Sequence, residues 1–168
     1  MSLLSPVVLF SIRRGLRCTG RQRGLSLIES MLVLCLLGVL LALAMPLWQK
    51  QRERALQRQA AQEIGAMSAV ISQYRLDNQG APASLAAVGM AGRLDPWGRS
   101  YVYYNLETGK SSGARKNRSL TPVNNDFDLY SLGPDGASAL ALTAQSSQDD
   151  VVRANNGRFI GPASTFTD

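Results

Sequence analysis

Histidine is absent from the 168 residues of this chain, and only two cysteines are present. Without histidine the chain can build neither a Ser-His-Asp or Cys-His nucleophile nor a zinc or iron site with imidazole ligands. Cys18 and Cys35 both precede residue 36, so the rest of the chain can form no disulfide framework. The loops of that part must therefore be fixed by core packing or by a bound ion.

The net charge of +6 belongs to one end of the chain. Residues 1–24 carry five basic residues, all arginine, and no acidic ones. Residues 49–168 carry 13 basic and 11 acidic residues, a net charge of only +2. A nucleic-acid-binding module would concentrate basic charge in its folded part. We therefore expect no nucleic-acid partner.

A long apolar segment follows the arginines. Residues 30–49 are 20 consecutive uncharged residues rich in Leu, Val, Ala and Met, which is the length that crosses a bilayer as a helix. A buried helix of a soluble protein is the alternative. No small-x-small cleavage site ends the segment, as it would in an ordinary secretory signal. The sequence predicts a single-pass membrane helix, whose orientation the flanking basic residues leave open because both sides are basic.

The helical pattern continues beyond this segment. Apolar residues recur at intervals of three and four, which is typical of one face of a helix: Leu56, Ala60, Ile64, Met67, Ile71 and Tyr74. Turn-forming residues at 77–82 predict its end. Pro46 removes one backbone donor, so we expect a kink or local break near residues 38–46. One helix would thus have a membrane half, residues 25–48, and an amphipathic half, residues 49–80.

The last part of the chain, residues 81–168, has short β-like segments separated by turns. A short helix is predicted at 84–90 and strands at 101–106, 126–132 and 158–161. The stretch 108–125 is rich in Gly, Ser, Lys, Arg and Asn, which predicts an exposed loop. The fold class expected is α+β, with the long helix packed on a small antiparallel sheet.

One carboxylate, Glu29, lies at the start of the apolar segment, in the sequence Arg-Gly-Leu-Ser-Leu-Ile-Glu. A charge in a membrane helix is costly unless it has a partner or reaches headgroup water. If the chain were cut after Gly24, the new amino group of Leu25 would lie one turn before Glu29 and could pair with it. The pair could form within one chain or between neighbouring helices.

These residues, with the apolar segment and Pro46, resemble the class III signal of type IV pilins and pseudopilins. The resemblance implies that residues 1–24 are a leader, that a prepilin peptidase cuts between Gly24 and Leu25, and that Leu25 is N-methylated. It also implies that Glu29 aligns incoming subunits. Leu at position 25 departs from the commoner Phe or Met, and the leader is long.

A second group of residues is acidic: Asp95-Pro-Trp-Gly, then Ser131-Leu-Gly-Pro-Asp-Gly136, then Asp149-Asp150. The Gly-Pro-Asp-Gly run forms a tight turn that directs carbonyls and a carboxylate to one side. Adjacent aspartates repel each other unless a cation or solvent screens them. An all-oxygen set suits Ca²⁺, but the residues are also compatible with solvated turn carboxylates. Trp97 is expected to cover the hydrophobic edge of the domain.

This group is similar to the major pseudopilins of type II secretion systems, and the resemblance implies a structural calcium ion. Its ligands would be the carbonyl of Leu132 and the side chains of Asp135, Asp149 and Asp150, with the carbonyl of Ser147 a further candidate. The segment between Asp135 and Asp149 is about seven residues longer than is usual in that family, so the carbonyl ligands can differ.

The function expected from the resemblance is structural, not enzymatic. The chain would be a pseudopilin held in the bacterial inner membrane with its C-terminal domain in the periplasm, then assembled into a homo-oligomeric filament that drives export of folded proteins. Partners would be prepilin peptidase, minor pseudopilins and an inner-membrane assembly platform. The alternatives are a type IV pilus subunit and a membrane-anchored hydrolase using Asp135, Asp149 and Asp150.

Overall fold

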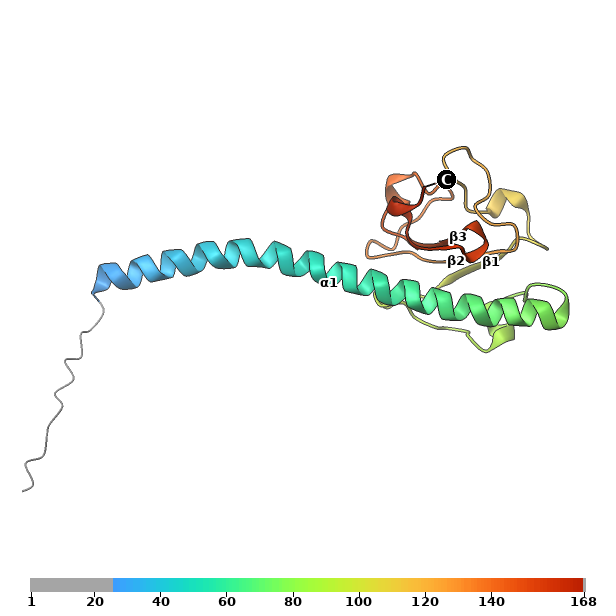
Figure 1. Ribbon diagram of the computed structural model, residues 1–168, viewed down its shortest axis with the longest axis horizontal. Coiled ribbons are helices and arrows are strands. Elements are labelled where there is room, and N and C mark those ends of the chain that lie inside the picture. The colour runs from blue at the N-terminus through green and yellow to red at the C-terminus, as the bar shows by residue number, and fades with distance from the viewer. Residues whose placement is uncertain (1–25, 168) are drawn as a thin grey trace, which may run out of the picture. The chain divides into compact units, whose positions relative to one another are not determined.

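The computed structural model describes residues 26–167, in two units divided between Leu43 and Ala44 (Figure 1). The first unit contains the beginning of helix α1 (Leu27–Asn78). The second contains the rest of α1 and all of the chain that follows it. The predicted leader and the cleavage position Gly24–Leu25 lie outside the described residues.

Helix α1 begins and ends as its sequence predicts. The side chain of Ser26 accepts a 3.3 Å hydrogen bond from the backbone N–H of Glu29, which caps the first turn. Pro46 lies inside the helix, and the helix continues through it without the local break expected near residues 38–46. The left-handed conformation of Gln79, with φ of 55°, ends the helix.

The predicted apolar stripe forms the core of the second unit. Its central residues are completely buried against the sheet: Ala60, Ile64, Met67 and Ile71. From the other side the sheet contributes Phe127, Leu129 and Val151 to the same cluster. Figure 1 shows the strands lying along the C-terminal part of α1. This packing holds helix and sheet as one hydrophobic core.

The sheet is antiparallel with the strand order β1-β2-β3-β4. Its strands are β1 (Val102–Asn105), β2 (Phe127–Ser131), β3 (Val151–Ala154) and β4 (Phe159–Pro162). Three of them lie where the sequence predicts strands, and a 3₁₀ turn (Leu85–Val88) lies in the predicted short helix. The α+β prediction is confirmed, although β3 was not predicted. The other 3₁₀ turns are Ser111–Gly113, Gln145–Ser147, Asn155–Gly157 and Ala163–Thr165.

Both faces of the sheet are covered. Alternation along the strands sends Phe127 and Leu129 toward α1 and Asp128 and Tyr130 to the opposite face. On that opposite face lies a second cluster of buried residues, made by Val123, Leu142, Val152, Ala154 and Ala163. Connecting segments, not a helix, therefore cover the far side of the sheet.

The stretch 108–125 is only in part the exposed loop that its composition predicts. Ala114, Arg115, Val123 and Asn124 are buried. The backbone N–H of Val123 donates a 2.9 Å hydrogen bond to the carbonyl of Arg115, so the chain pairs with itself across the turn between these residues. Burial of the small apolar residues holds residues 114–115 and 123–124 on the sheet, while residues 110–112 and the turn at 118–122 are exposed.

Candidate functional site

The first candidate feature is the start of α1. Glu29 lies in the first turn and is exposed. Its spacing from Ser26 is that of a capping box, and the Ser26 half of that box is formed. The partner predicted for Glu29 is the amino group that Leu25 would have after cleavage, and Leu25 lies outside the described residues. The pairing of Glu29 with that group stays a prediction.

The second feature is the apolar surface of α1. Large apolar side chains between Leu27 and Trp48 are exposed, with 78% of Leu27 and 77% of Trp48 accessible. By length and composition this part of α1 could cross a membrane, and none of its most apolar window is buried. An exposed apolar surface of this size is unfavourable in water. It requires lipid or other apolar helices around it.

The third feature is the acidic loop, which we define as residues 132–150. Its predicted calcium ligands have different surroundings. The carbonyl of Leu132 accepts a 3.2 Å hydrogen bond from the N–H of Gly136. Asp135 is exposed and accepts from the N–H of Ala137 at 2.8 Å. Asp149 is half-buried, and its Oδ2 lies 3.4 Å from the backbone nitrogen of Asp135.

Asp150 is completely buried and has a cationic partner. Its Oδ2 accepts a 2.7 Å hydrogen bond from Nη2 of Arg115 and a 2.6 Å hydrogen bond from the hydroxyl of Ser138. Burial raises the pKa of Asp150, while the contacts with Ser138 and Arg115 act in the opposite direction. The side chain of Asp150 faces Arg115 in the interior, and this ion pair offsets the repulsion from the adjacent Asp149.

This arrangement does not fit the calcium ion that the resemblance implies. Ca²⁺ takes six to eight oxygen ligands at about 2.3–2.6 Å. Among residues 26–167, no group of three or more acidic, His or Cys side chains is placed to hold a metal. The buried carboxylate, Asp150, already contacts a guanidinium. Calcium binding by Asp135, Asp149, Asp150 and the Leu132 carbonyl stays a prediction.

The turn at 95–98 and the arginine that follows it hold the start of the acidic loop in place by hydrogen bonds. The buried carboxylate of Asp95 accepts hydrogen bonds from the N–H of Arg99 at 2.8 Å and from the hydroxyl of Ser131 at 2.6 Å. The guanidinium of Arg99 in turn donates to the carbonyls of Gly133 and Pro134. The turn therefore organises the loop, and Trp97 packs against the core as expected for an edge residue.

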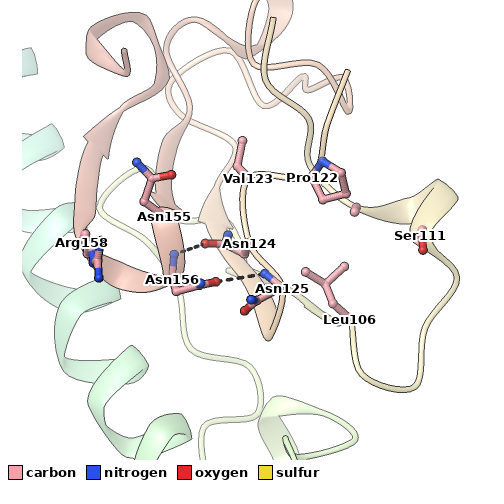
Figure 2. A pocket seen from close by; sticks show the side chains of 10 residues that line it. Leu106, Ser111, Pro122, Val123, Asn124, Asn125, Asn155, Asn156 and Arg158 are labelled. Atoms are coloured by element: carbon pink, nitrogen blue, oxygen red, sulfur yellow. Dashed lines mark hydrogen bonds between the residues drawn. The ribbon is translucent and has the colours of Figure 1, made fainter. Parts of the chain in front are cut away.

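A polar hollow of about 1000 Å³ lies at the end of the sheet (Figure 2). Its lining includes Asn124, Asn125, Asn155 and Asn156. Figure 2 shows Asn124, Asn125 and Asn156 joined by hydrogen bonds. The N–H of Asn156 donates to the side chain of Asn124 at 2.8 Å, and the N–H of Asn125 donates to the side chain of Asn156 at 3.0 Å. The amides tie the chain before β2 to the β3–β4 turn. Its ten lining residues include no carboxylate for acid-base chemistry.

Sequence reasoning missed two buried arginines, Arg115 and Arg153. Arg153 on β3 donates to Asp126 at 2.7 and 2.9 Å and to Ser68 of α1 at 2.9 Å. Its guanidinium also lies over the ring of Phe127, 3.9 Å from the centroid. The two adjacent β-branched residues Val151 and Val152 could have indicated a strand at this position. For Arg115 the only local sign of burial was the presence of the apolar residues Ala114 and Val123 on either side of a turn.

Comparison with known proteins shows which proteins this chain is similar to. The type II secretion system core protein G of Escherichia coli K12 is 32% identical over 142 residues, covering 72% of this chain and 88% of that protein. The Klebsiella pneumoniae protein of the same name is 31% identical, covering 69% and 87%. The fimbrial protein EcpC of Eikenella corrodens is 34% identical over 74 residues, covering 44% and 48%. No family model and no solved structure matches. With this identity over most of both chains, and with a long helix packed on a small antiparallel sheet, the chain belongs to the family of type II secretion system core protein G.

Proposed function

We propose that this chain is a structural subunit of a type II secretion pseudopilus, a helical periplasmic filament that drives export of folded proteins across the outer membrane. The observation that carries the proposal is the exposed apolar surface of α1 joined to a folded α+β unit, in a chain of this family. In a filament, copies of that helix cover one another and the folded units face outward. Burying the helices among themselves removes the cost of exposing them.

The subunit is made as a membrane-anchored precursor. Residues 1–24 are removed by prepilin peptidase, which cuts between Gly24 and Leu25, and Leu25 is then N-methylated. Loss of the leader removes five arginines. Before assembly the subunit spans the inner membrane once, with its C-terminal domain in the periplasm. The assembly platform in that membrane and the minor pseudopilins are its partners.

Glu29 and Pro46 act in assembly. A carboxylate among apolar side chains is costly without a cation, so Glu29 of an incoming subunit pairs with the amino group of a Leu25 already in the filament. This pairing sets the stagger between neighbouring helices. Pro46 lacks the backbone N–H that would bond to residue 42, so it is the position where the helix most readily loosens when helices pack.

Mass spectrometry of the mature N-terminus tests the proposal. In cells that contain prepilin peptidase we expect an N-methylated Leu25, and Glu29→Ala should be cut normally but fail to assemble. Gln73→Ala, a change on an exposed position of the same helix, is the matched control and should assemble. An assembled protein that still begins at Met1 would contradict the proposal.

A type IV pilus subunit is the second candidate, favoured by the partial match to a fimbrial protein. Deleting the gene in its host separates the two. Loss of exoprotein export with normal surface pili supports the pseudopilus, and loss of pili with normal export supports the pilus. A hydrolase has less support, because Asp150 is bound to Arg115 and so is not placed as a general acid or base.

A further inference from the structure

A positive charge of the chain itself, the guanidinium of Arg115, already contacts the acidic loop. The Arg115 guanidinium and the Asp150 carboxylate form an ion pair of 2.7 Å, with 2% and 0% of their side chains exposed. We propose that Arg115 occupies the place in this loop for which a calcium ion is predicted, so that the folded unit is stable without calcium. The proposal concerns stability and does not depend on the function proposed above.

The backbone around Arg115 fixes the position of the guanidinium. The N–H of Arg115 donates to Oδ2 of Asp128 on β2 at 2.7 Å. The next residue, Lys116, exchanges hydrogen bonds with the acidic loop: its N–H donates to Leu140 at 2.8 Å, and its carbonyl accepts from Leu142 at 2.9 Å. Arg115 is therefore held between β2 and the acidic loop and can turn its side chain only along the face of the sheet.

The guanidinium has partners on several sides. Besides Asp150, it donates to the hydroxyl of Ser138 and lies over the ring of Tyr130, 4.3 Å from the centroid. Ser138 also donates to Asp150, which closes a triangle of Arg115, Ser138 and Asp150. A buried charge is tolerated when it is both paired and hydrogen-bonded. The surroundings of Arg115 meet both conditions.

The long segment between Asp135 and Asp149 supplies the remaining contacts. It provides Ser138, and Ser147 closes it by accepting from the N–H and donating to the carbonyl of Ala139, both at 2.9 Å. It also provides the backbone that pairs with Lys116. Through Ser138 this segment thus contacts the guanidinium directly, and its other hydrogen bonds hold Ser138 in place.

A calcium ion at Asp150 would meet this guanidinium at short range. Like charges repel strongly in a buried, weakly polarisable environment. Two buried atoms of the pair have no hydrogen-bond partner, Nε of Arg115 and Oδ1 of Asp150. Nε is a donor and Oδ1 an acceptor, but they do not bond to each other; the ion pair is made by Nη2 and Oδ2.

Melting of the full mature chain in detergent micelles tests the inference. We expect the same melting temperature in EGTA, in calcium chloride and in magnesium chloride, and no heat of binding when calcium chloride is titrated into the chelator-treated protein. A melting temperature that falls in EGTA and is restored by calcium but not by magnesium would overturn the inference. So would stoichiometric calcium binding to the unaltered chain.

Substitution of the arginine gives an independent measurement. Arg115→Met, which keeps the unbranched stem of the side chain but removes the guanidinium and its charge, should lower the melting temperature in EGTA by about 5–10 °C. Arg118→Met, at an exposed arginine of the same stretch, is the matched control and should leave it unchanged. Equal melting of the two variants would overturn the inference. If Arg115→Met does not fold, Ser138→Ala replaces it, and a melting temperature equal to that of the control then overturns the inference.

Discussion

The phenol of Tyr101 donates a 2.7 Å hydrogen bond to the carboxylate of Glu63, which lies 38 residues earlier on α1. Tyr101 is 5% exposed, and it joins the same apolar cluster as Ile64 and Met67. Burial, together with the neighbouring Glu63 charge, raises the pKa of Tyr101 well above its usual value. The phenol therefore stays protonated and keeps donating across the ordinary pH range.

Removing this hydrogen bond should weaken the attachment of helix to sheet. Tyr101→Phe keeps the ring and deletes the donor, so we expect the free energy of unfolding to fall by about 1 kcal/mol in urea denaturation. Tyr104→Phe is the control, because the hydroxyl of Tyr104 bonds only to the exposed carbonyl of Lys110. A loss as large for Tyr104→Phe as for Tyr101→Phe would show that the Glu63 contact contributes nothing particular.

Arg153 should be the most sensitive polar residue of the core. Arg153→Met leaves the carboxylate of Asp126 buried without its cation, so we expect a loss of about 3–5 kcal/mol in the free energy of unfolding. Arg158→Met, at an exposed arginine that follows the β3–β4 turn, should change it by less than about 0.5 kcal/mol. Urea denaturation of both variants measures this. A small effect at Arg153 would contradict the assigned network.

Acid should destabilise the second unit through carboxylates whose pKa is lowered on folding. The N–H of Ala81, and then Arg75, lower the pKa of Glu107 below its ordinary value of 4.5. Burial alone would raise the pKa of Asp126, but Arg153 lowers it overall. A carboxyl with a lowered pKa stabilises the fold above its unfolded-state pKa and loses that contribution as the pH falls through the folded-state pKa.

Glu107→Gln tests this pH dependence. The unaltered chain should lose free energy of unfolding between about pH 5 and pH 3, and the variant should lose less over the same interval. Chemical denaturation at a series of pH values gives both curves. Parallel curves for the two proteins would mean that Glu107 has the same pKa in the folded and unfolded states.

Substitution of two glycines should separate the destabilisation caused by backbone strain from the destabilisation caused by steric crowding. Gly133 and Gly92 have similar positive φ values, 63° and 67°. A Cβ on Gly133 would lie 2.6 Å from the carbonyl oxygen of Asp149, whereas a Cβ on Gly92 would meet nothing within 4 Å. Gly92→Ala should cost about 1 kcal/mol for strain alone. Gly133→Ala should cost clearly more, measured by thermal melting, and an equal cost would show that the loop simply shifts.

Local patterns were enough to predict most of the fold. The spacing of Ala60, Ile64, Met67 and Ile71 identifies the buried face of α1, because an apolar stripe at helical period needs a surface to cover it. Strands β1, β2 and β4 carry aromatic and branched residues that mark them individually. Strand β3 was missed because it carries no aromatic residue and directly follows two aspartates, which are unusual in strands.

The surroundings of the acidic loop could not be predicted from local patterns. The ion pair of Arg115 with Asp150 joins residues 35 positions apart. Composition places Arg115 in an exposed loop, because its neighbours along the chain are polar. Only the three-dimensional fold, with the far face of the sheet needing cover, brings the guanidinium into the interior. Resemblance pointed to this loop and its aspartates as calcium ligands, which stays a prediction, but it could not reveal the contact between Arg115 and Asp150.

The contact between Ser68 and Arg153 has a consequence for the time at which the second unit can fold. The two residues are 85 positions apart, so α1 obtains this polar anchor only after almost the entire chain has been synthesised. Contacts of such long sequence separation form late, because a long loop must first be closed. A chain that stops before β3 would lack Val151 in the core and the Arg153 contact, so the apolar stripe of α1 would be covered only by the earlier strands. Truncated chains should therefore hold α1 less firmly and be more open to proteolysis than complete ones.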